Sequence, residues 1–427
     1  MSENVIKYVE NEILGEGYYE IDHKSGLKMF VYPKPDYTSA YALFGTKYGS
    51  VDTRYKRSDR NEFTDIPAGT AHFLEHKLFE SEELDAFERY AETGASANAF
   101  TSFDRTCYLF NCSGNFKANF EILLDFVRHP YFTEETVQKE QGIIGQEIDM
   151  YKDSPEWESF FNLLEGMYFN HPVKIDIAGT KESISQITAE MLFDCYNTYY
   201  NLSNMALAVS GNVSLDEVLE VADRLLESDP PFTVNRAFAD EPDGIVKPYV
   251  EERLSVVTPV FAFGYKEKPS KEGDIKQETA MNIIFEIAVG QMSDFYKQML
   301  EDDLINNNFG TEYFNGPSYA ATTFSGESPN PQAVAERIKV RMNELKSGGV
   351  DAVDFEIVRK KHYGKIVRAF TDIETVANGL VVSHFENDEL FSEFRALREL
   401  DVEYVNTLLR ASFNDDKSVL SVILPKQ

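Results

Sequence analysis

The chain has 427 residues, of which 43% are hydrophobic and 26% charged, as in globular proteins with roughly two to four domains. Its 72 acidic and 41 basic residues give a formal net charge of −31, which excludes nucleic acid as a general partner because phosphates require Lys and Arg. Three cysteines and no apolar run of membrane-spanning length argue against a disulfide scaffold, secretion and a membrane span, so we expect a cytoplasmic protein.

The first half of the chain alternates between strand and helix patterns. Strands are predicted where β-branched and aromatic residues alternate, and helices where apolar residues recur at every third or fourth position. In chain order we expect strands at 27–33 and 40–50, helices at 69–80 and 82–92, a strand over 97–112, helices at 116–128, 133–152 and 156–168, a strand at 205–210 and a helix at 214–227.

A proline-containing stretch at 231–250 is the predicted linker, so 1–230 and 251–427 are the predicted domains. The second half repeats the order of elements coarsely, which suggests a duplication without any residue-level repeat. Strands mixed with runs of helices indicate the α+β class. The expected elements are a strand at 256–265, a helix at 278–301, strands at 309–326, helices at 330–347, 351–370, 372–381 and 401–411, and a strand at 418–424.

The helix predicted at 69–80 carries the pattern H-x-x-E-H as His72, Glu75 and His76. Positions four apart share one helix face, so the two imidazoles can converge on one ion, and neutral imidazoles suit zinc. Glu75 stands close enough to take a proton from a zinc-bound water without binding the metal. This is the inverted zincin signature of metallopeptidases. The alternative is a surface helix with two incidental histidines.

A catalytic zinc site needs a third protein ligand beside an open position. The helix predicted at 133–152 offers Glu140 and Glu147, which lie seven residues apart and therefore on one face. One could bind zinc while the other orients a ligand through a hydrogen bond. Spacing alone leaves their roles open, and either glutamate could instead be an exposed helix charge.

These residues resemble the motifs of the pitrilysin family, which includes insulin-degrading enzyme and the mitochondrial processing peptidase. In that family a glutamate ligand follows H-x-x-E-H at a distance similar to the 71 residues between His76 and Glu147. The resemblance implies that Glu147 is the third zinc ligand. It also implies that Glu140 is the carboxylate that orients a ligand through a hydrogen bond without binding the metal. It also implies that Asn98 and Ala99 lie on an edge strand beside which an extended peptide binds, whereas the alternative for Asn98 is turn chemistry. The same resemblance makes His171 part of the scaffold.

The family resemblance implies an architecture of two related α/β domains. Each would be an antiparallel-rich mixed sheet with helices on one face, and the two would face each other as a clam shell around a chamber. Residues 1–230 would form the zinc-binding catalytic domain, and 251–427 the domain that completes the substrate chamber. A chain of this length resembles the short two-domain members, similar to mitochondrial processing peptidase subunits, which usually pair with a second chain.

The second half departs from the family pattern. Members with a complete site carry an Arg and a Tyr there that polarise the substrate carbonyl. In this chain the matching positions hold Leu300 and Asn306. Tyr313 is nearby but does not align with the position of the Tyr. A donor of this kind contributes roughly 3–4 kcal/mol of transition-state stabilisation. We therefore expect a paralogous pitrilysin-family subunit to supply the pair.

Two functions follow from these patterns. The first is a zinc-dependent endopeptidase that cleaves peptides or unfolded segments by zinc-hydroxide attack with Glu75 as general base, as part of a homo- or heterodimer. The second is a non-catalytic peptide-binding or scaffold subunit of a pitrilysin-fold complex. The intact Glu75 favours the first, because a scaffold has no need of that carboxylate. The missing Arg and Tyr favour the second, or an active site split between two chains.

Overall fold

The computed structural model describes residues 3–82, 84–230, 232–271 and 274–426. The chain divides into two compact units. The first comprises the residues up to Gln146, Asp176–Ala237 and Val367–Leu390, and the second comprises Glu147–Ile175, Phe238–Ile366 and the residues from Phe391 onward. None of the described helices is both long enough and apolar enough to cross a membrane.

The first unit is built on a seven-stranded sheet with the order β1-β2-β3-β9-β4-β8-β7. β3 and β9 are parallel and the other neighbours are antiparallel. Every residue of β4 and β9 is buried, as expected for central strands covered on both faces. The strands are β1 (Val5–Asn11), β2 (Glu16–Asp22), β3 (Lys28–Pro33), β4 (Ala40–Thr46), β7 (Ser96–Thr101), β8 (Thr106–Cys112) and β9 (Met205–Gly211).

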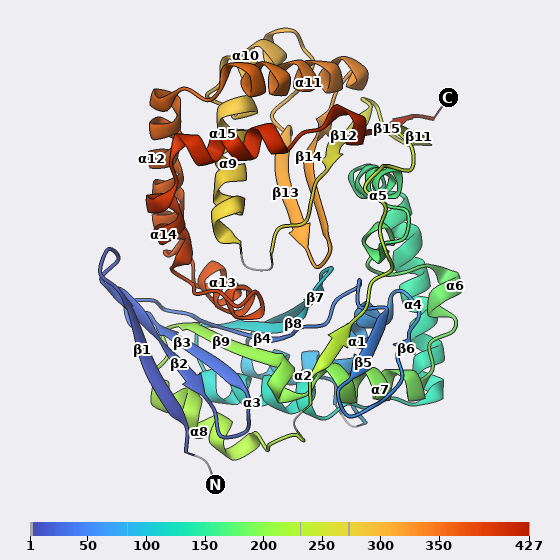
Figure 1. Ribbon diagram of the computed structural model, residues 1–427. Coiled ribbons are helices and arrows are strands. Elements are labelled where there is room, and N and C mark those ends of the chain that lie inside the picture. The colour runs from blue at the N-terminus through green and yellow to red at the C-terminus, as the bar shows by residue number, and fades with distance from the viewer. Residues whose placement is uncertain (1–2, 83, 231, 272–273, 427) are drawn as a thin grey trace. The chain divides into compact units, whose positions relative to one another are not determined.

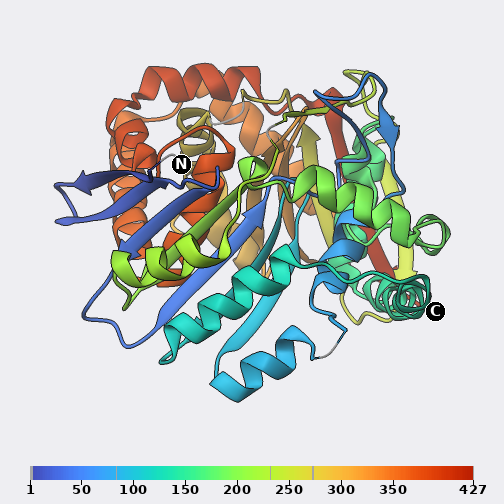
Figure 2. The ribbon, with the colours of Figure 1, turned by 90° about the horizontal axis from the view of Figure 1, so that it is seen from below.

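Helices cover both faces of this sheet. α3 and α8 lie on one face, and α13 packs on the other against β4 and β9 (Figures 1 and 2). A small separate sheet has the order β10-β5-β6. The remaining elements of this unit are β5 (Arg54–Arg57), β6 (Thr64–Asp65), α1 (Thr70–Leu78), α2 (Ala86–Thr93), α3 (Phe116–Arg128), α4 (Glu134–Lys152, which continues into the second unit), α6 (Lys181–Ile184), α7 (Ala189–Tyr199), α8 (Leu215–Leu225), β10 (Val234–Arg236) and α13 (Ile373–Phe385).

The second unit holds a five-stranded sheet with the order β11-β15-β12-β14-β13. β11 and β15 are parallel and the other neighbours are antiparallel. Its elements are α5 (Pro155–Met167), β11 (Tyr249–Leu254), β12 (Val260–Lys266), α9 (Ile275–Val289), α10 (Asp294–Glu301), β13 (Gly310–Gly316), β14 (Tyr319–Glu327), α11 (Pro331–Gly348), α12 (Ala352–Ala369, which continues into the first unit), α14 (Ser392–Glu399), α15 (Val402–Ala411) and β15 (Ser418–Pro425).

The two sheets share one topology. The order β3-β9-β4-β8-β7 in the first unit matches β11-β15-β12-β14-β13 in the second, with the same parallel and antiparallel neighbours. By chain order, α1 corresponds to α9, α3 to α11, α4 to α12 and α5 to α13. The duplication that the sequence only suggested is therefore visible in the connectivity, and the predicted α+β class is confirmed.

The two halves exchange one helix each. α5 follows the first-half helices but packs on β12 and β15 of the second unit, while α13 follows the second-half helices but packs on β4 and β9 of the first. A glycine makes room for each exchanged helix. A Cβ on Gly45 would lie 2.9 Å from Val381 of α13, and one on Gly264 would lie 3.0 Å from Met167 of α5.

Because of this exchange, the two units do not contain the same residues as the two domains predicted on either side of the 231–250 linker. That stretch carries β10 and the start of β11. Residue 231 lies outside the described residues. The division into domains at 1–230 and 251–427 stays a prediction. In detail, the predicted strand 97–112 is the hairpin β7–β8, and the predicted helix 278–301 is the pair α9 and α10.

Candidate active site

The helix that carries the H-x-x-E-H motif is fixed at its first turn. Gly69 precedes α1 with φ +88, a conformation that favours glycine, and a Cβ there would lie 2.4 Å from the Ala178 carbonyl oxygen. The helix then packs against β7 and β8. Phe73 and Leu74 are buried in this contact layer, so one face of α1 is held and the motif is fixed in place.

His72, His76 and Glu147 converge. The rings of the two histidines, four residues apart on α1, have centroids 4.6 Å from each other. One ligand atom from each histidine and one carboxylate oxygen of Glu147 on α4 all lie within 4.8 Å of one another. Two imidazole nitrogens and a carboxylate oxygen are a donor set that fits zinc. The sequence-predicted ligand set is thus brought together by two helices.

The two histidines differ in their surroundings. The carboxylate of Glu140 accepts a hydrogen bond from His76 Nδ1, 2.9 Å away, the kind of contact that orients the ring of a metal-binding histidine. His72 is 7% exposed, and its burial lowers its pKa to about 3, with the neighbouring His76 acting in the same direction. The low pKa of His72 favours the neutral imidazole that metal binding requires.

Glu75 is oriented by the edge strand. The Thr101 hydroxyl on β7 donates a hydrogen bond to Glu75 Oε2 at 2.7 Å. The sequence did not predict this contact. No local pattern could have predicted it, because it joins residues 26 positions apart on two elements.

Tyr151 is a second residue that the sequence analysis missed. Its hydroxyl donates a hydrogen bond to Glu147 Oε1 at 2.9 Å, one helical turn further along α4. Its ring stacks on Trp157, with centroids 4.7 Å apart. The spacing of four residues between Glu147 and Tyr151 was a usable signal, since such pairs face each other on a helix.

β7 is an edge strand of its sheet, with β8 as its neighbour. Asn98 is exposed there, and its side-chain oxygen accepts a hydrogen bond from the backbone N–H of Ala99 at 2.9 Å. The position thus agrees with the edge strand expected for a peptide substrate, although this contact of Asn98 is local.

The second-unit positions matched to the missing Arg and Tyr hold other contacts. The side-chain nitrogen of Asn306 donates a hydrogen bond to Glu327 Oε2 at 2.6 Å. Leu300 is an apolar residue at the C-terminal end of α10. The Tyr313 hydroxyl accepts a hydrogen bond from Gln277 at 2.9 Å, and burial raises its pKa to about 12. None of these three described side chains carries a cationic group.

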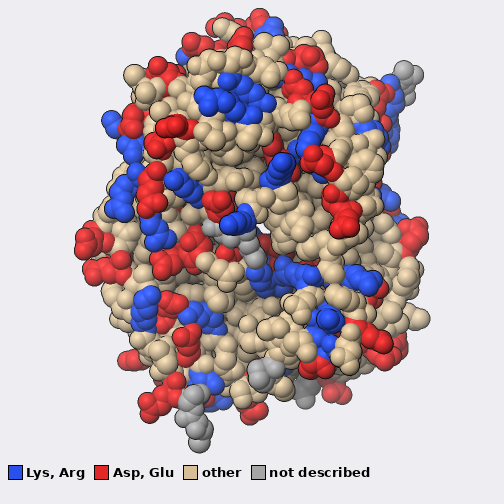
Figure 3. Space-filling view, in the orientation of Figure 1, with Lys and Arg blue, Asp and Glu red and all other residues tan. Residues whose placement is uncertain are grey.

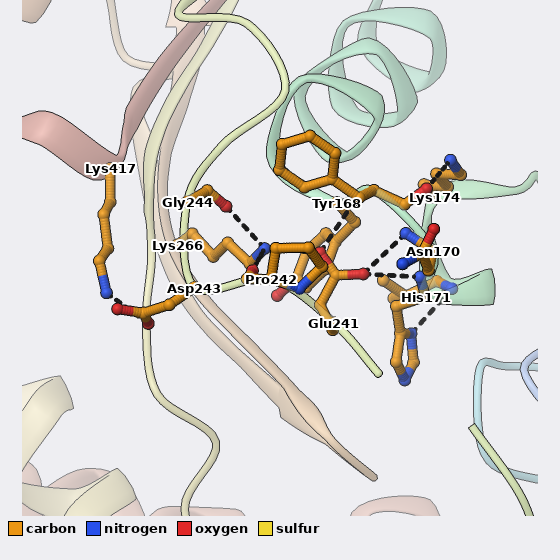
Figure 4. Close-up of polar contacts among 12 residues, drawn as sticks. Tyr168, Asn170, His171, Lys174, Glu241, Pro242, Asp243, Gly244, Lys266 and Lys417 are labelled. Carbon is orange, nitrogen blue, oxygen red and sulfur yellow. Dashed lines mark hydrogen bonds and ion pairs between the residues drawn. The ribbon is translucent and has the colours of Figure 1, made fainter. Parts of the chain in front are cut away.

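His171 belongs to a polar cluster of the second unit (Figure 4). Its Nδ1 accepts a hydrogen bond from Val173 N–H at 3.1 Å, and its Nε2 lies 3.0 Å from the Pro317 carbonyl oxygen. Glu241 accepts hydrogen bonds from the backbone N–H groups of residues 169–171, and its carboxylate also pairs with Lys266 at 2.6 Å. With both ring nitrogens engaged, His171 has the scaffold position that the resemblance implied.

Two family models match the chain, one described as insulinase (peptidase family M16) over residues 60–181 and one as the peptidase M16 inactive domain over residues 186–361. The chain is 38% identical to the "Uncharacterized zinc protease YmfH" of Bacillus subtilis over 99% of this chain and 100% of that protein. The chain belongs to peptidase family M16. The predicted pitrilysin-family, short two-domain membership is confirmed.

Other M16 relatives are more distant or cover part of the chain. The beta subunit of the mitochondrial-processing peptidase of Bos taurus is 31% identical over 40% of this chain and 34% of that protein. A solved putative M16-like peptidase from Alicyclobacillus acidocaldarius superposes with a TM-score of 0.91 at 32% identity, covering 100% of this chain and 99% of the other. The M16 fold thus extends over the full described chain.

Proposed function

We propose that this chain is a zinc-dependent endopeptidase in which His72, His76 and Glu147 hold the metal. The observation that carries the proposal is the convergence of their ligand atoms within 4.8 Å. Three protein donors beside an open position are typical of catalytic rather than structural zinc. The relative from Bacillus subtilis, whose name calls it a zinc protease, supports the same activity.

Glu75 is the proposed proton carrier. When bound, zinc supplies a Lewis acid for the scissile carbonyl. Glu75 accepts a proton from the attacking water and passes it to the leaving amine nitrogen, the two transfers that peptide hydrolysis requires. The hydrogen bond from Thr101 fixes the orientation of this carboxylate. The hydrogen bonds of Glu140 and Tyr151 hold His76 and Glu147 in the same way.

Peptides or unfolded segments are the proposed substrates, bound extended along β7. An edge strand offers unpaired backbone groups to which a peptide can add as a further strand. β7 also carries Thr101, which contacts Glu75, so a peptide beside Asn98 and Ala99 would lie next to the residue that moves protons.

A paralogous M16 subunit is the proposed partner. The motivating observation is that Leu300 and Asn306 stand at the places matched to the carbonyl-polarising Arg and Tyr. Adding a paralogue that carries the pair should raise peptide cleavage by roughly 100-fold or more, the size of a lost oxyanion donor. If the mixture is no faster than this chain alone, the partner proposal fails. The cytoplasm stays the predicted location.

The second candidate function is a non-catalytic peptide-binding subunit. The residues Leu300 and Asn306, at the positions matched to the Arg and Tyr, favour it. Cleavage of a fluorescence-quenched peptide by the wild type and by Glu75→Gln separates the two, with Glu135→Gln, an exposed position on α4, as the control. We expect Glu75→Gln to keep its zinc and lose at least about 100-fold in turnover, as for loss of a general base. Equal turnover in both proteins would contradict the catalytic role.

A further inference from the structure

The duplication identifies the place in the second unit that corresponds to the candidate metal centre. α4 begins at Glu134 and α12 at Ala352. Val358 and Lys365 therefore lie as far along α12 as Glu140 and Glu147 lie along α4. A carboxylate pair on one helix face is thus replaced by an apolar residue and a lysine.

α9, the counterpart of α1, supplies the other side of this place. Its Asn282 and Glu286 are four residues apart and therefore lie on one face of the helix, further along α9 than His72 and His76 lie along α1. Both line a cavity of about 320 Å³ together with Val358. The remaining lining residues are Phe285, Gly290, Thr311, Lys361, His362 and Lys365.

Glu286 is the centre of an ion-pair network inside this cavity. Lys361 Nζ contacts its Oε1, and Lys365 Nζ lies 3.2 Å from its Oε2. Burial acts to raise the pKa of Glu286, but the hydrogen bonds and charges of the two lysines outweigh it and hold the pKa below the usual value. Glu286 is therefore ionised, and the three side chains together carry a net charge of about +1 near neutral pH.

The cavity has more hydrogen-bond donors than Glu286 uses. An ammonium group has three N–H donors, and each lysine directs one of them to Glu286 in the contacts described above. The Thr311 hydroxyl and the Asn282 amide line the same space. His362 is held by Glu393, whose Oε1 is 2.8 Å from Nε2. The site therefore combines excess positive charge with several donors.

We propose that this cavity binds a carboxylate group through Lys361 and Lys365. A monoanion balances the net charge, whereas a dianionic phosphate would add a second negative charge close to Glu286. The group could be carried by the C-terminus of a peptide or by a small carboxylic acid, because the recognising chemistry is the same.

The charge of the molecular surface is mixed. The chain has a net charge of −31, yet Figure 3 shows basic side chains interspersed with acidic ones over the face drawn. Because the network is small and partly open to solvent, we expect binding to weaken as salt is added.

The test uses the full chain with the Glu75→Gln substitution, so that peptides are not cleaved. Calorimetry compares one short peptide with a free C-terminal carboxylate, the same peptide amidated, and acetate alone. Each is measured against this protein, against the same protein with Lys365→Gln, and against a control with Lys297→Gln on α10, outside the cavity. Lys365→Gln keeps the Lys361–Glu286 pair and so avoids leaving a half-buried carboxylate unpaired.

We expect the free-acid peptide to bind at least tenfold more tightly than the amide, and Lys365→Gln to remove that difference while Lys297→Gln keeps it. Binding of acetate that depends on Lys365, without preference between the peptides, would assign the site to small acids. Equal binding of acid and amide with no acetate binding, or equal effects of both lysine variants, would overturn the proposal. The choice of a peptide as carrier rests on the proposed function, but the binding test does not need turnover, so the two can fail separately.

Discussion

Corresponding places in the two halves of this chain hold different chemistry on one scaffold. On α1 and α4, His72, His76 and Glu147 converge on a point that suits a metal ion. On the corresponding helices α9 and α12, Glu286 lies between Lys361 and Lys365. The backbone topology is the same, so the difference teaches that the function resides in a few side chains grafted on the fold and not in the fold itself.

Removing a metal ligand from the first half should have the largest effect. We expect His76→Ala to lower kcat/KM by about 1,000-fold or more, equivalent to about 4 kcal/mol of lost transition-state stabilisation. Peptide cleavage and bound zinc are measured together. His129→Ala, an exposed histidine at the end of α3, is the matched control and should change neither. Full activity in His76→Ala would contradict the conclusion that the first half, unlike the second, holds a catalytic metal site.

Glu267 gives the second half a pH dependence of its own. Burial raises its pKa to about 7. Between about pH 4.5 and 7 the folded state keeps the proton that the unfolded chain loses, so ionisation favours unfolding as the pH rises. The wild type should therefore lose up to about 3 kcal/mol of unfolding free energy over this range relative to Glu267→Gln. Denaturant titrations of both proteins at several pH values check this, and parallel curves would contradict it.

Substituting Glu140 tests how strongly zinc binding in the first half depends on the carboxylate that is hydrogen-bonded to His76. Glu140→Gln replaces the charged acceptor at His76 Nδ1 by a neutral amide oxygen and should weaken zinc binding by about 10–100-fold. Competition with a chelator measures the affinity, with Glu135→Gln on the same helix as the control. An unchanged affinity would mean that the ligands alone define the site.

We expect the smallest effects from substituting the glycines that face the exchanged helices. Gly45→Ala forces a methyl group against Val381 of α13, at an expected cost of about 1–3 kcal/mol of stability. Gly264→Ala should cost more, because its methyl group would meet the Thr322 backbone oxygen at 2.5 Å as well as Met167 of α5 at 3.0 Å. Gly142→Ala on α4 meets nothing within 4 Å and should be neutral or slightly stabilising. Thermal or denaturant unfolding is the measurement. A Gly45→Ala variant as stable as the wild type would show that α13 does not pack as described.

The sequence predicted the local features of the site and missed the contacts between distant segments. His72, Glu75 and His76 form a motif whose spacing on one helix is enough to infer chemistry, and the family resemblance extended it to Glu147. The exchange of α5 and α13 depends on tertiary packing, which helical periodicity does not encode. Thr101 is a similar case, because its contact with Glu75 arises only when β7 meets α1.

The second half was the harder part to interpret from sequence. Sequence comparison there indicated what is missing, at Leu300 and Asn306, but had no means of predicting what is present. Glu286 and Lys361 are 75 residues apart and carry no recognised motif. Their meaning comes from the duplicated topology, which became visible only in the order of the strands.

Counting zinc ions per chain is the most direct test of the account's central claim, that the first half alone provides a metal site. Elemental analysis and native mass spectrometry of the purified chain should give one zinc per wild-type chain and none in Glu147→Gln, with the fold retained. Two zinc ions per wild-type chain, or one that persists in Glu147→Gln and His76→Ala alike, would contradict the assignment.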